Sequence, residues 1–168
     1  MIDLSTFHSS EYEYDFSIFG TITVDDGGIQ REINVEICPD DNEKISDSSK
    51  EELQFFADNY NKYREIYLDA LLKYYERRRI NLGYTGEEEK DGYPCITTTA
   101  QLLETITFTG MMIHKHKRSG HHAIGLFFDC TWEQEHGAGV LMAGYEVISA
   151  GDYDDAYYAY ALNDHTPK

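Results

Sequence analysis

Residues 129–137 concentrate the side chains of this sequence that could perform chemistry. The segment reads Asp-Cys-Thr-Trp-Glu-Gln-Glu-His-Gly and contains the only tryptophan of the chain. Glu133, Glu135 and His136 could ligate a metal or form an acid–base pair, because carboxylate and imidazole groups serve both tasks. A helical H-E-x-x-H motif places two histidines on one face, whereas this segment has a single histidine in a predicted turn. The alternative is a structural turn in which Trp132 packs on the core and the final glycine supplies a special backbone angle.

Four histidines form a second candidate group on either side of a basic run. They are His114, His116, His121 and His122. Two histidines separated by one residue on a strand share a face, and imidazole suits zinc, so a site with His136 or Cys130 is conceivable. Neighbouring Lys and Arg side chains would repel a cation, so a solvated, charged connection between two strands is the alternative. We therefore predict no bound metal.

Motifs for nucleophilic catalysis and phosphate binding are missing from the sequence. Neither Ser119 nor Cys130 lies in a G-x-S-x-G elbow. The glycine-rich loops that cradle phosphates are absent as well. We therefore predict that the protein is not an enzyme and has no cofactor. The alternative is a metal-dependent or acid–base enzyme that uses the turn with His136, Glu133 and Glu135.

Alternating apolar residues near the N-terminus predict a β-hairpin. Even-numbered positions from Tyr12 to Val24 are mostly apolar, and a second alternation covers residues 33–37. Residues 25–28, Asp-Asp-Gly-Gly, tolerate positive φ and suit the turn. Pairing about this turn would gather acidic side chains on one sheet face: Glu11, Glu13, Asp15, Glu32 and Glu36. The alternative is the ordinary polar outer face of a half-exposed sheet.

A long helix and several C-terminal strands complete the expected fold. Apolar residues recur at three- and four-residue steps over residues 48–83, which predicts one long amphipathic helix that ends near Gly83. We expect short helices at 99–106 and 154–162, and strands at 107–115, 123–128, 139–143 and 146–150. The prediction is a single α+β domain over residues 1–168. Its antiparallel sheet packs against the long helix, and the acidic hairpin face lies on the side away from that helix.

The charge of the chain favours a basic partner. The 168 residues include 14 Lys plus Arg against 31 Asp plus Glu, a formal charge of −17. Direct nucleic-acid binding is disfavoured, because affinity for the phosphate backbone depends on Lys and Arg. The three cysteines are widely spaced, and neither a signal peptide nor an apolar run of membrane-spanning length is visible. We expect a soluble cytoplasmic protein that has no membrane contact.

Residues 124–140 resemble part of a known family. An apolar strand leads into a W-x-x-E-H-G turn at Trp132 to Gly137, and Glu146-Val147 and Ala150-Gly151 follow. This pattern resembles an uncharacterised family of small, acidic, cytosolic bacterial domains, whose N-terminal hairpin and long helix ending in Tyr-Tyr also match the order seen here. Members are similar in size and acidity to immunity proteins of bacterial toxin systems, including contact-dependent growth inhibition. The family has no established catalytic residues.

Charge and resemblance together predict an immunity protein. It would bind a cognate basic toxin domain, expected to be a nuclease, and occlude the toxin's active site through an acidic, tyrosine-rich surface. The predicted contact residues are Glu11, Glu13, Asp15, Glu32, Glu36, Asp152, Asp154 and Asp155. A binding module for some other basic protein would need the same surface, so this alternative stays open.

Overall fold

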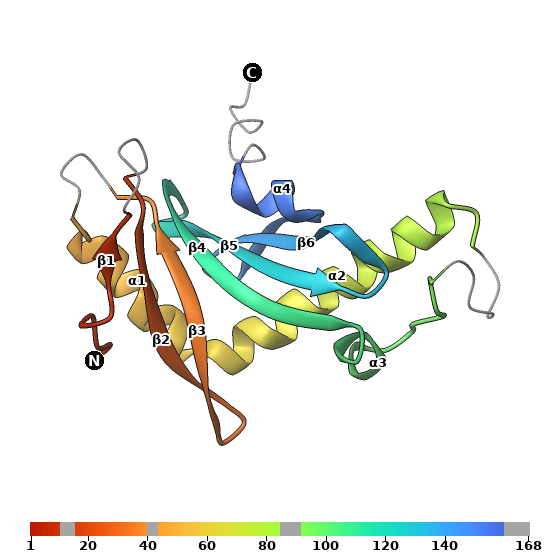
Figure 1. The fold of residues 1–168 in the computed structure, drawn as a ribbon, viewed down its shortest axis with the longest axis horizontal. Coiled ribbons are helices and arrows are strands. Elements are labelled where there is room, and N and C mark those ends of the chain that lie inside the picture. The colour runs from red at the N-terminus through yellow and green to blue at the C-terminus, as the bar shows by residue number, and fades with distance from the viewer. Residues whose placement is uncertain (11–15, 40–43, 85–91, 160–168) are drawn as a thin grey trace.

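The computed structural model describes residues 1–10, 16–39, 44–84 and 92–159, which adopt an α+β fold (Figure 1). One sheet of seven strands has the order β1-β2-β3-β4-β5-β6-β7. The strands are β1 (His8–Ser9), β2 (Ile18–Asp26), β3 (Ile29–Ile37), β4 (Ile106–Arg118), β5 (His121–Cys130), β6 (Glu133–Ala143) and β7 (Glu146–Gly151). The helices are α1 (Asp47–Asp58), α2 (Tyr60–Asn81), α3 (Thr99–Leu103) and α4 (Tyr153–Tyr157).

The sheet is larger than a hairpin plus C-terminal strands, and it is not wholly antiparallel. The predicted hairpin of β2 and β3 is present, and its turn glycines Gly27 and Gly28 have φ of 64° and 93°. Strands β3 and β4 run parallel, while the other neighbouring strands are antiparallel. A parallel pair needs a long crossover, and α1, α2 and α3 lie within it along the chain.

The expected single long helix is two helices, because the chain breaks at Asn59. The Asn59 backbone is not helical, with φ −117° and ψ 18°. Its side-chain amide donates to the carbonyl of Phe55 at 2.8 Å and accepts a hydrogen bond from the Tyr145 hydroxyl at 2.8 Å. An asparagine that bonds the backbone in this way competes with helix continuation. In the ranges that the structure covers, no helix combines the length and the apolar character needed to cross a membrane.

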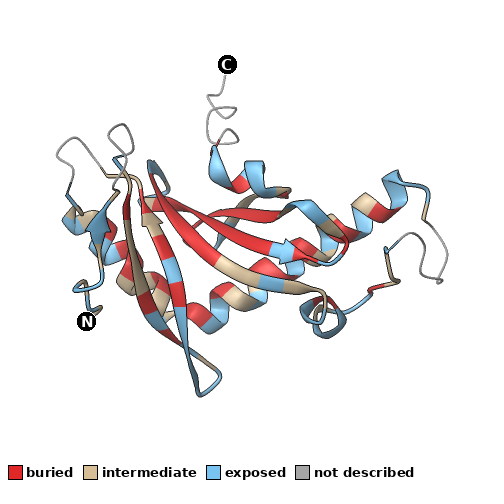
Figure 2. Cartoon of the chain, in the orientation of Figure 1, coloured by how far each residue is buried: buried red, intermediate tan, exposed pale blue. Residues whose placement is uncertain are grey.

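The main core lies between α1, α2 and one face of the sheet, which we call the inner face. Alternate residues of β2 and β3 point into it, including Ile22, Val35 and Ile37, and α2 adds Tyr63 and Tyr75. Figure 2 shows these strands as buried bands that alternate with exposed ones on β2 and β3. The aromatic spacing of α2 therefore serves packing, as its helical period predicts.

Helix α4 covers part of the opposite, outer face, over β5, β6 and β7. Three glycines leave room for it, because a Cβ on Gly125 would lie 2.5 Å from the Ala156 carbonyl oxygen and one on Gly139 would lie 2.7 Å from the Ala156 Cβ. A Cβ on Gly151 would meet only the carboxylate of Asp155 as its nearest atoms. The backbone of α4 thus rests directly on the strands and leaves β2 and β3 uncovered by it.

Candidate functional site: a hollow on the outer face of the sheet

Glu32 and Glu36 lie on the outer face, the side that the alternation of β3 predicts for them. Their registered partners on β2 are Thr23 and Phe19, whereas Ile33, Val35 and Ile37 point into the core. The other predicted contact residues of the hairpin, Glu11, Glu13 and Asp15, lie outside the described residues. The described part of the predicted acidic hairpin face is therefore formed by Glu32 and Glu36.

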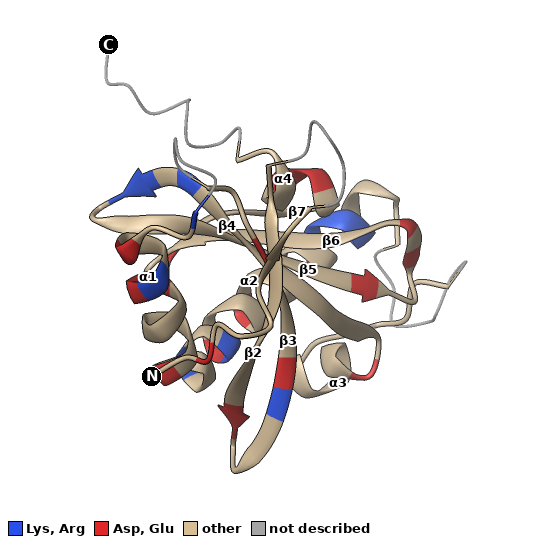
Figure 3. Ribbon diagram, turned by 60° about the vertical axis from the view of Figure 1, so that its left-hand side comes forward, with Lys and Arg blue, Asp and Glu red and all other residues tan. Residues whose placement is uncertain are grey.

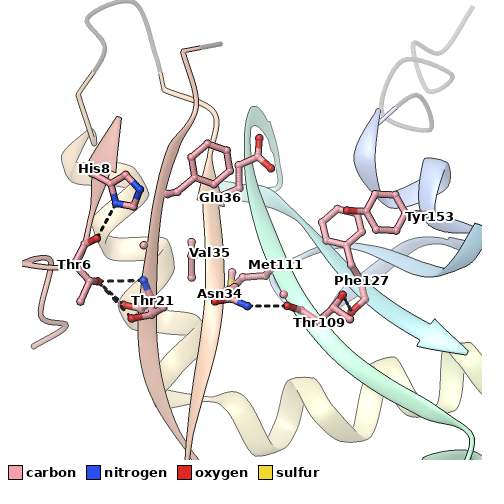
Figure 4. A pocket seen from close by; sticks show the side chains of 13 residues that line it. Thr6, His8, Thr21, Asn34, Val35, Glu36, Thr109, Met111, Phe127 and Tyr153 are labelled. Carbon is pink, nitrogen blue, oxygen red and sulfur yellow. Dashed lines mark hydrogen bonds between the residues drawn. The ribbon is translucent and has the colours of Figure 1, made fainter. Parts of the chain in front are cut away.

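A hollow of about 470 Å³ opens on this face between β1 and α4. Figure 4 shows His8 at one end, Glu36 at the rim, and Phe127 with Tyr153 at the other end. The backbones of Gly20 and Gly110 contribute to its lining. Its volume falls in the range of ordinary ligand pockets. The hollow can therefore accommodate a side chain from a partner.

An aromatic pair forms the α4 side of the hollow. The rings of Phe127 and Tyr153 stack with centroids 4.4 Å apart and an interplanar angle of 30°. Phe127 is buried, whereas Tyr153 keeps 42% of its surface exposed. Partial burial raises the pKa of the Tyr153 phenol, and the negative charges of Glu36 and Asp129 raise it further. The phenol is therefore neutral near pH 7 and lies in the field of two carboxylates.

Hydrogen bonds fix the polar groups of the hollow in place. Glu36 accepts a bond of 2.7 Å from the Ser17 hydroxyl. The Asn34 amide donates to the Thr109 carbonyl at 3.3 Å and links β3 to β4 (Figure 4). The Thr6 hydroxyl accepts from the Thr21 backbone N–H at 3.1 Å, which ties the N-terminal segment to β2. These bonds hold the site in a formed state before any partner arrives.

The three predicted acids at the C-terminal end lie elsewhere. Asp154 and Asp155 are exposed on α4, and Asp152 precedes the helix. Burial raises the pKa of the Tyr74 phenol, and the charges of Asp152 and Asp155 contribute to that rise. None of the three acids lines the hollow. Phe127 and Asp129 were not identified from the sequence. They are two residues apart on β5, so both side chains lie on the same, outer face.

The segment from Trp132 to Gly137 is only partly a turn, because β6 begins at Glu133, but it has the structural role that we weighed as the alternative to a metal or acid–base site. Trp132 is buried, its indole N–H donates to the Thr105 hydroxyl at 3.2 Å, and its ring centroid lies 4.8 Å from that of Tyr75. Gly137 has φ of 56°, and a Cβ there would lie 2.6 Å from the Phe128 carbonyl oxygen. Both features match the structural interpretation.

Glu133 is held by an arginine from the end of α2. Its carboxylate forms an ion pair with Arg78, whose guanidinium also donates to the Tyr93 hydroxyl at 3.1 Å. His136 Nδ1 lies 3.3 Å from the other Glu133 oxygen, and the His136 side chain is 66% exposed. This arrangement ties α2 to the β5–β6 turn. To act as a general base, Glu133 would have to give up its ion pair with Arg78.

The expected solvated connection is wrong for His114 and His122, whereas His116 is exposed. Strand β4 continues to Arg118, and both His114 and His122 are buried. His122 Nδ1 lies 2.7 Å from the His114 carbonyl oxygen, and His122 Nε2 lies 2.9 Å from the Ser48 hydroxyl. His121 Nδ1 lies 3.1 Å from the buried Glu52 carboxylate. Among the described residues, no three His, Cys, Asp or Glu side chains are grouped to hold a metal.

His114 makes the stability of the fold pH-dependent. Its Nε2 lies 2.8 Å from the Ala156 carbonyl oxygen, so it holds α4 on the sheet. Burial lowers the pKa of His114, the bond to Ala156 opposes this, and His116 lowers it further. His114 therefore binds a proton more readily in the unfolded chain than in the folded protein. The stability that neutral His114 contributes is full above about pH 6.5 and declines as the pH falls toward the folded-state value.

Replacing His114 by Gln, which can still donate to Ala156, should remove that pH dependence. We expect the stability advantage of the parent protein over His114→Gln to shrink between about pH 7.5 and about pH 5, by about 1.4 kcal/mol for each unit of pKa lowering. Urea unfolding at several pH values measures it. The control is His136→Gln at an exposed position. An advantage that stays constant with pH would contradict the assignment.

One family model matches most of the chain. The model is described as Domain of unknown function (DUF6985), and it matches residues 6–158. This span contains the described part of the hollow, the structural turn and α4. No curated protein and no solved structure matches the chain.

Proposed function

The chain belongs to the DUF6985 family, and we propose that it is an immunity protein whose outer sheet face binds a basic toxin domain and blocks its active site. One observation carries the proposal. Glu36 from β3, Phe127 from β5 and Tyr153 from α4, which are far apart in the sequence, line one hollow on the outer face. The chain around them carries a formal charge of −17.

The chemistry of a nuclease toxin explains why this face would suit it. A nuclease must attract phosphate and so presents Lys and Arg around its active site, and an inhibitor with an acidic face matches that field. Complementary fields raise association rates, which matters when an inhibitor must act before the toxin does. Tyrosine side chains then supply the desolvated anchors that hold a complex together. The hollow contains both kinds of group.

The distribution of positive charge supports the same face. In Figure 3, Lys and Arg lie along the helices, at the far end of β4 and on β3, where Arg31 pairs with Asp26. Within the described ranges, no Lys or Arg lines the hollow. Several of the helix cations pair with neighbouring acids, as Lys62 does with Glu65 and Lys73 with Asp69. A basic partner would therefore meet no Lys or Arg in the described lining of the hollow.

The test starts from the partner. Immobilised protein is exposed to an extract of its source cells at low salt, and each basic protein that elutes as salt rises is expressed alone and together with this chain. The proposal requires a basic protein that is toxic alone and neutralised by co-expression. A basic partner without toxicity would point to a binding module of another kind. Absence of any such toxin would overturn the proposal.

Charge reversal then tests the face. Glu36→Lys with Asp129→Lys should slow association with the toxin at least tenfold at low salt and abolish protection of the cells. The matched control is Glu51→Lys with Glu76→Lys, which changes the net charge equally at exposed positions on α1 and α2. Equal slowing by both pairs would show that total charge matters and the outer face does not.

A further inference from the structure

An aromatic ring and a carboxylate line the hollow, and the charge of a second carboxylate acts on that ring. The Tyr153 ring, supported from below by Phe127, offers an aromatic face. The Glu36 carboxylate, held by Ser17, lies at the rim of the same hollow (Figure 4). Asp129 adds a second negative field from β5. Both carboxylates would repel an anionic ligand at the hollow, and the described lining contains no Lys or Arg that could bind one.

A planar cation fits this combination better than a compact one. A guanidinium stacks on aromatic rings and forms two parallel hydrogen bonds to one carboxylate, whereas an ammonium is a strongly hydrated point charge. The Ser17 hydroxyl donates to Glu36, which holds the carboxylate at the rim of the hollow. Gly110, beside Phe127 in the β4–β5 register, adds no side chain to the floor, so a long stem can enter over the sheet.

We infer that the hollow is an anchor site for one arginine side chain of the basic partner, with its guanidinium stacked on Tyr153 and hydrogen-bonded to Glu36. This inference rests on the proposed function and makes it more specific, because it names the residue type that enters. It also gives the two ends of the hollow different roles. The aromatic end and Glu36 bind the guanidinium, while the end near His8 accommodates the flanking partner backbone.

A short peptide tests the anchor without the partner. Acetyl-Gly-Arg-Gly-amide is titrated into the ¹⁵N-labelled protein and followed by amide chemical shifts, beside peptides with lysine or with uncharged citrulline in place of arginine. We expect saturable shifts at β3, β5 and α4 for arginine, at least about tenfold weaker binding for citrulline, and intermediate binding for lysine.

Two pairs of variants locate the binding groups. Glu36→Gln should weaken the arginine peptide about tenfold or more, whereas Glu32→Gln, on the same strand and face but outside the hollow, should leave it unchanged. Tyr153→Phe keeps the ring and should retain binding, while Tyr153→Leu should weaken it severalfold. Circular dichroism of each variant confirms that the fold is intact.

The outcomes separate the anchor from the wider proposal. Equal binding of all three peptides, or equal effects of the Glu36 and Glu32 substitutions, would overturn the arginine anchor even if a toxin partner were captured. Specific arginine binding that depends on Glu36 and the Tyr153 ring would establish the anchor. If no toxic partner were then found, the failure would belong to the immunity assignment alone.

Discussion

Replacing Trp132 by Ala should lower the free energy of unfolding by about 3–5 kcal/mol, the usual cost of truncating a large buried aromatic side chain. Trp132 is 5% exposed and contacts the rings of Tyr74, Tyr75 and Tyr93. Its removal would leave a cavity at the junction of α2 with the β5–β6 turn. Chemical denaturation monitored by circular dichroism gives the value directly.

A second substitution at this position separates packing from hydrogen bonding. Trp132→Phe keeps an aromatic ring but loses the bond from the indole N–H to Thr105, so we expect a loss of about 1–2 kcal/mol. A loss under about 1 kcal/mol for Trp132→Ala would contradict the structural role of the turn. The acid–base interpretation of His136 and Glu133 would then regain weight.

Replacing Gly139 by Ala should detach α4 from the sheet. The added Cβ would lie 2.7 Å from the Ala156 Cβ and 2.8 Å from the Asp152 carbonyl oxygen, so backbone has to move. We expect a loss of about 1–3 kcal/mol, with faster hydrogen exchange and proteolysis over residues 153–159. Because α4 carries Tyr153, binding of the arginine peptide should fall as well.

Gly151→Ala is the matched control for this substitution. Its added Cβ would meet the carboxylate end of the Asp155 side chain, which can rotate away at low cost. Neither Gly139 nor Gly151 has a positive φ, so alanine strains neither backbone. If hydrogen exchange and proteolysis of α4 were the same in both variants, the direct packing of α4 on β6 would be contradicted.

Local patterns predicted much of the fold. The alternation of β2 and β3 and the Asp-Asp-Gly-Gly turn indicated the hairpin, and Glu32 and Glu36 accordingly lie on the outer face. The glycine after His136 indicated a special backbone angle, which Gly137 has. These features depend on neighbouring residues, so a single sequence carries enough information for them.

Contacts between distant segments were not predictable in this way. The apolar period continues across Asn59, and the break depends on a hydrogen bond from Tyr145, which lies 86 positions later in the chain. The parallel pairing of β3 with β4 depends on how the helices cross the sheet. His114 appeared to belong to a charged loop because its neighbours are basic, whereas the structure buries it beneath α4.

The candidate site was predicted only in part for the same reason. Acid-rich segments indicated Glu36 as a contact residue on a tyrosine-rich surface, but not that Glu36 and Tyr153 would line one hollow. Phe127 of β5 joins them and stacks on Tyr153. Asp152 and Asp155 do not line the hollow. Strand register and the position of α4 therefore decide which acids share a surface.

Carboxyl footprinting of the toxin complex tests the central claim most directly. Free and bound protein are labelled with a carbodiimide and an amine, and mass spectrometry compares labelling of each acid. The account predicts that Glu36 and Asp129 lose most of their labelling in the complex, while Glu51 and Glu76 on the helices keep theirs. Protection of Glu51 and Glu76, with Glu36 and Asp129 labelled as in the free protein, would contradict binding through the outer face.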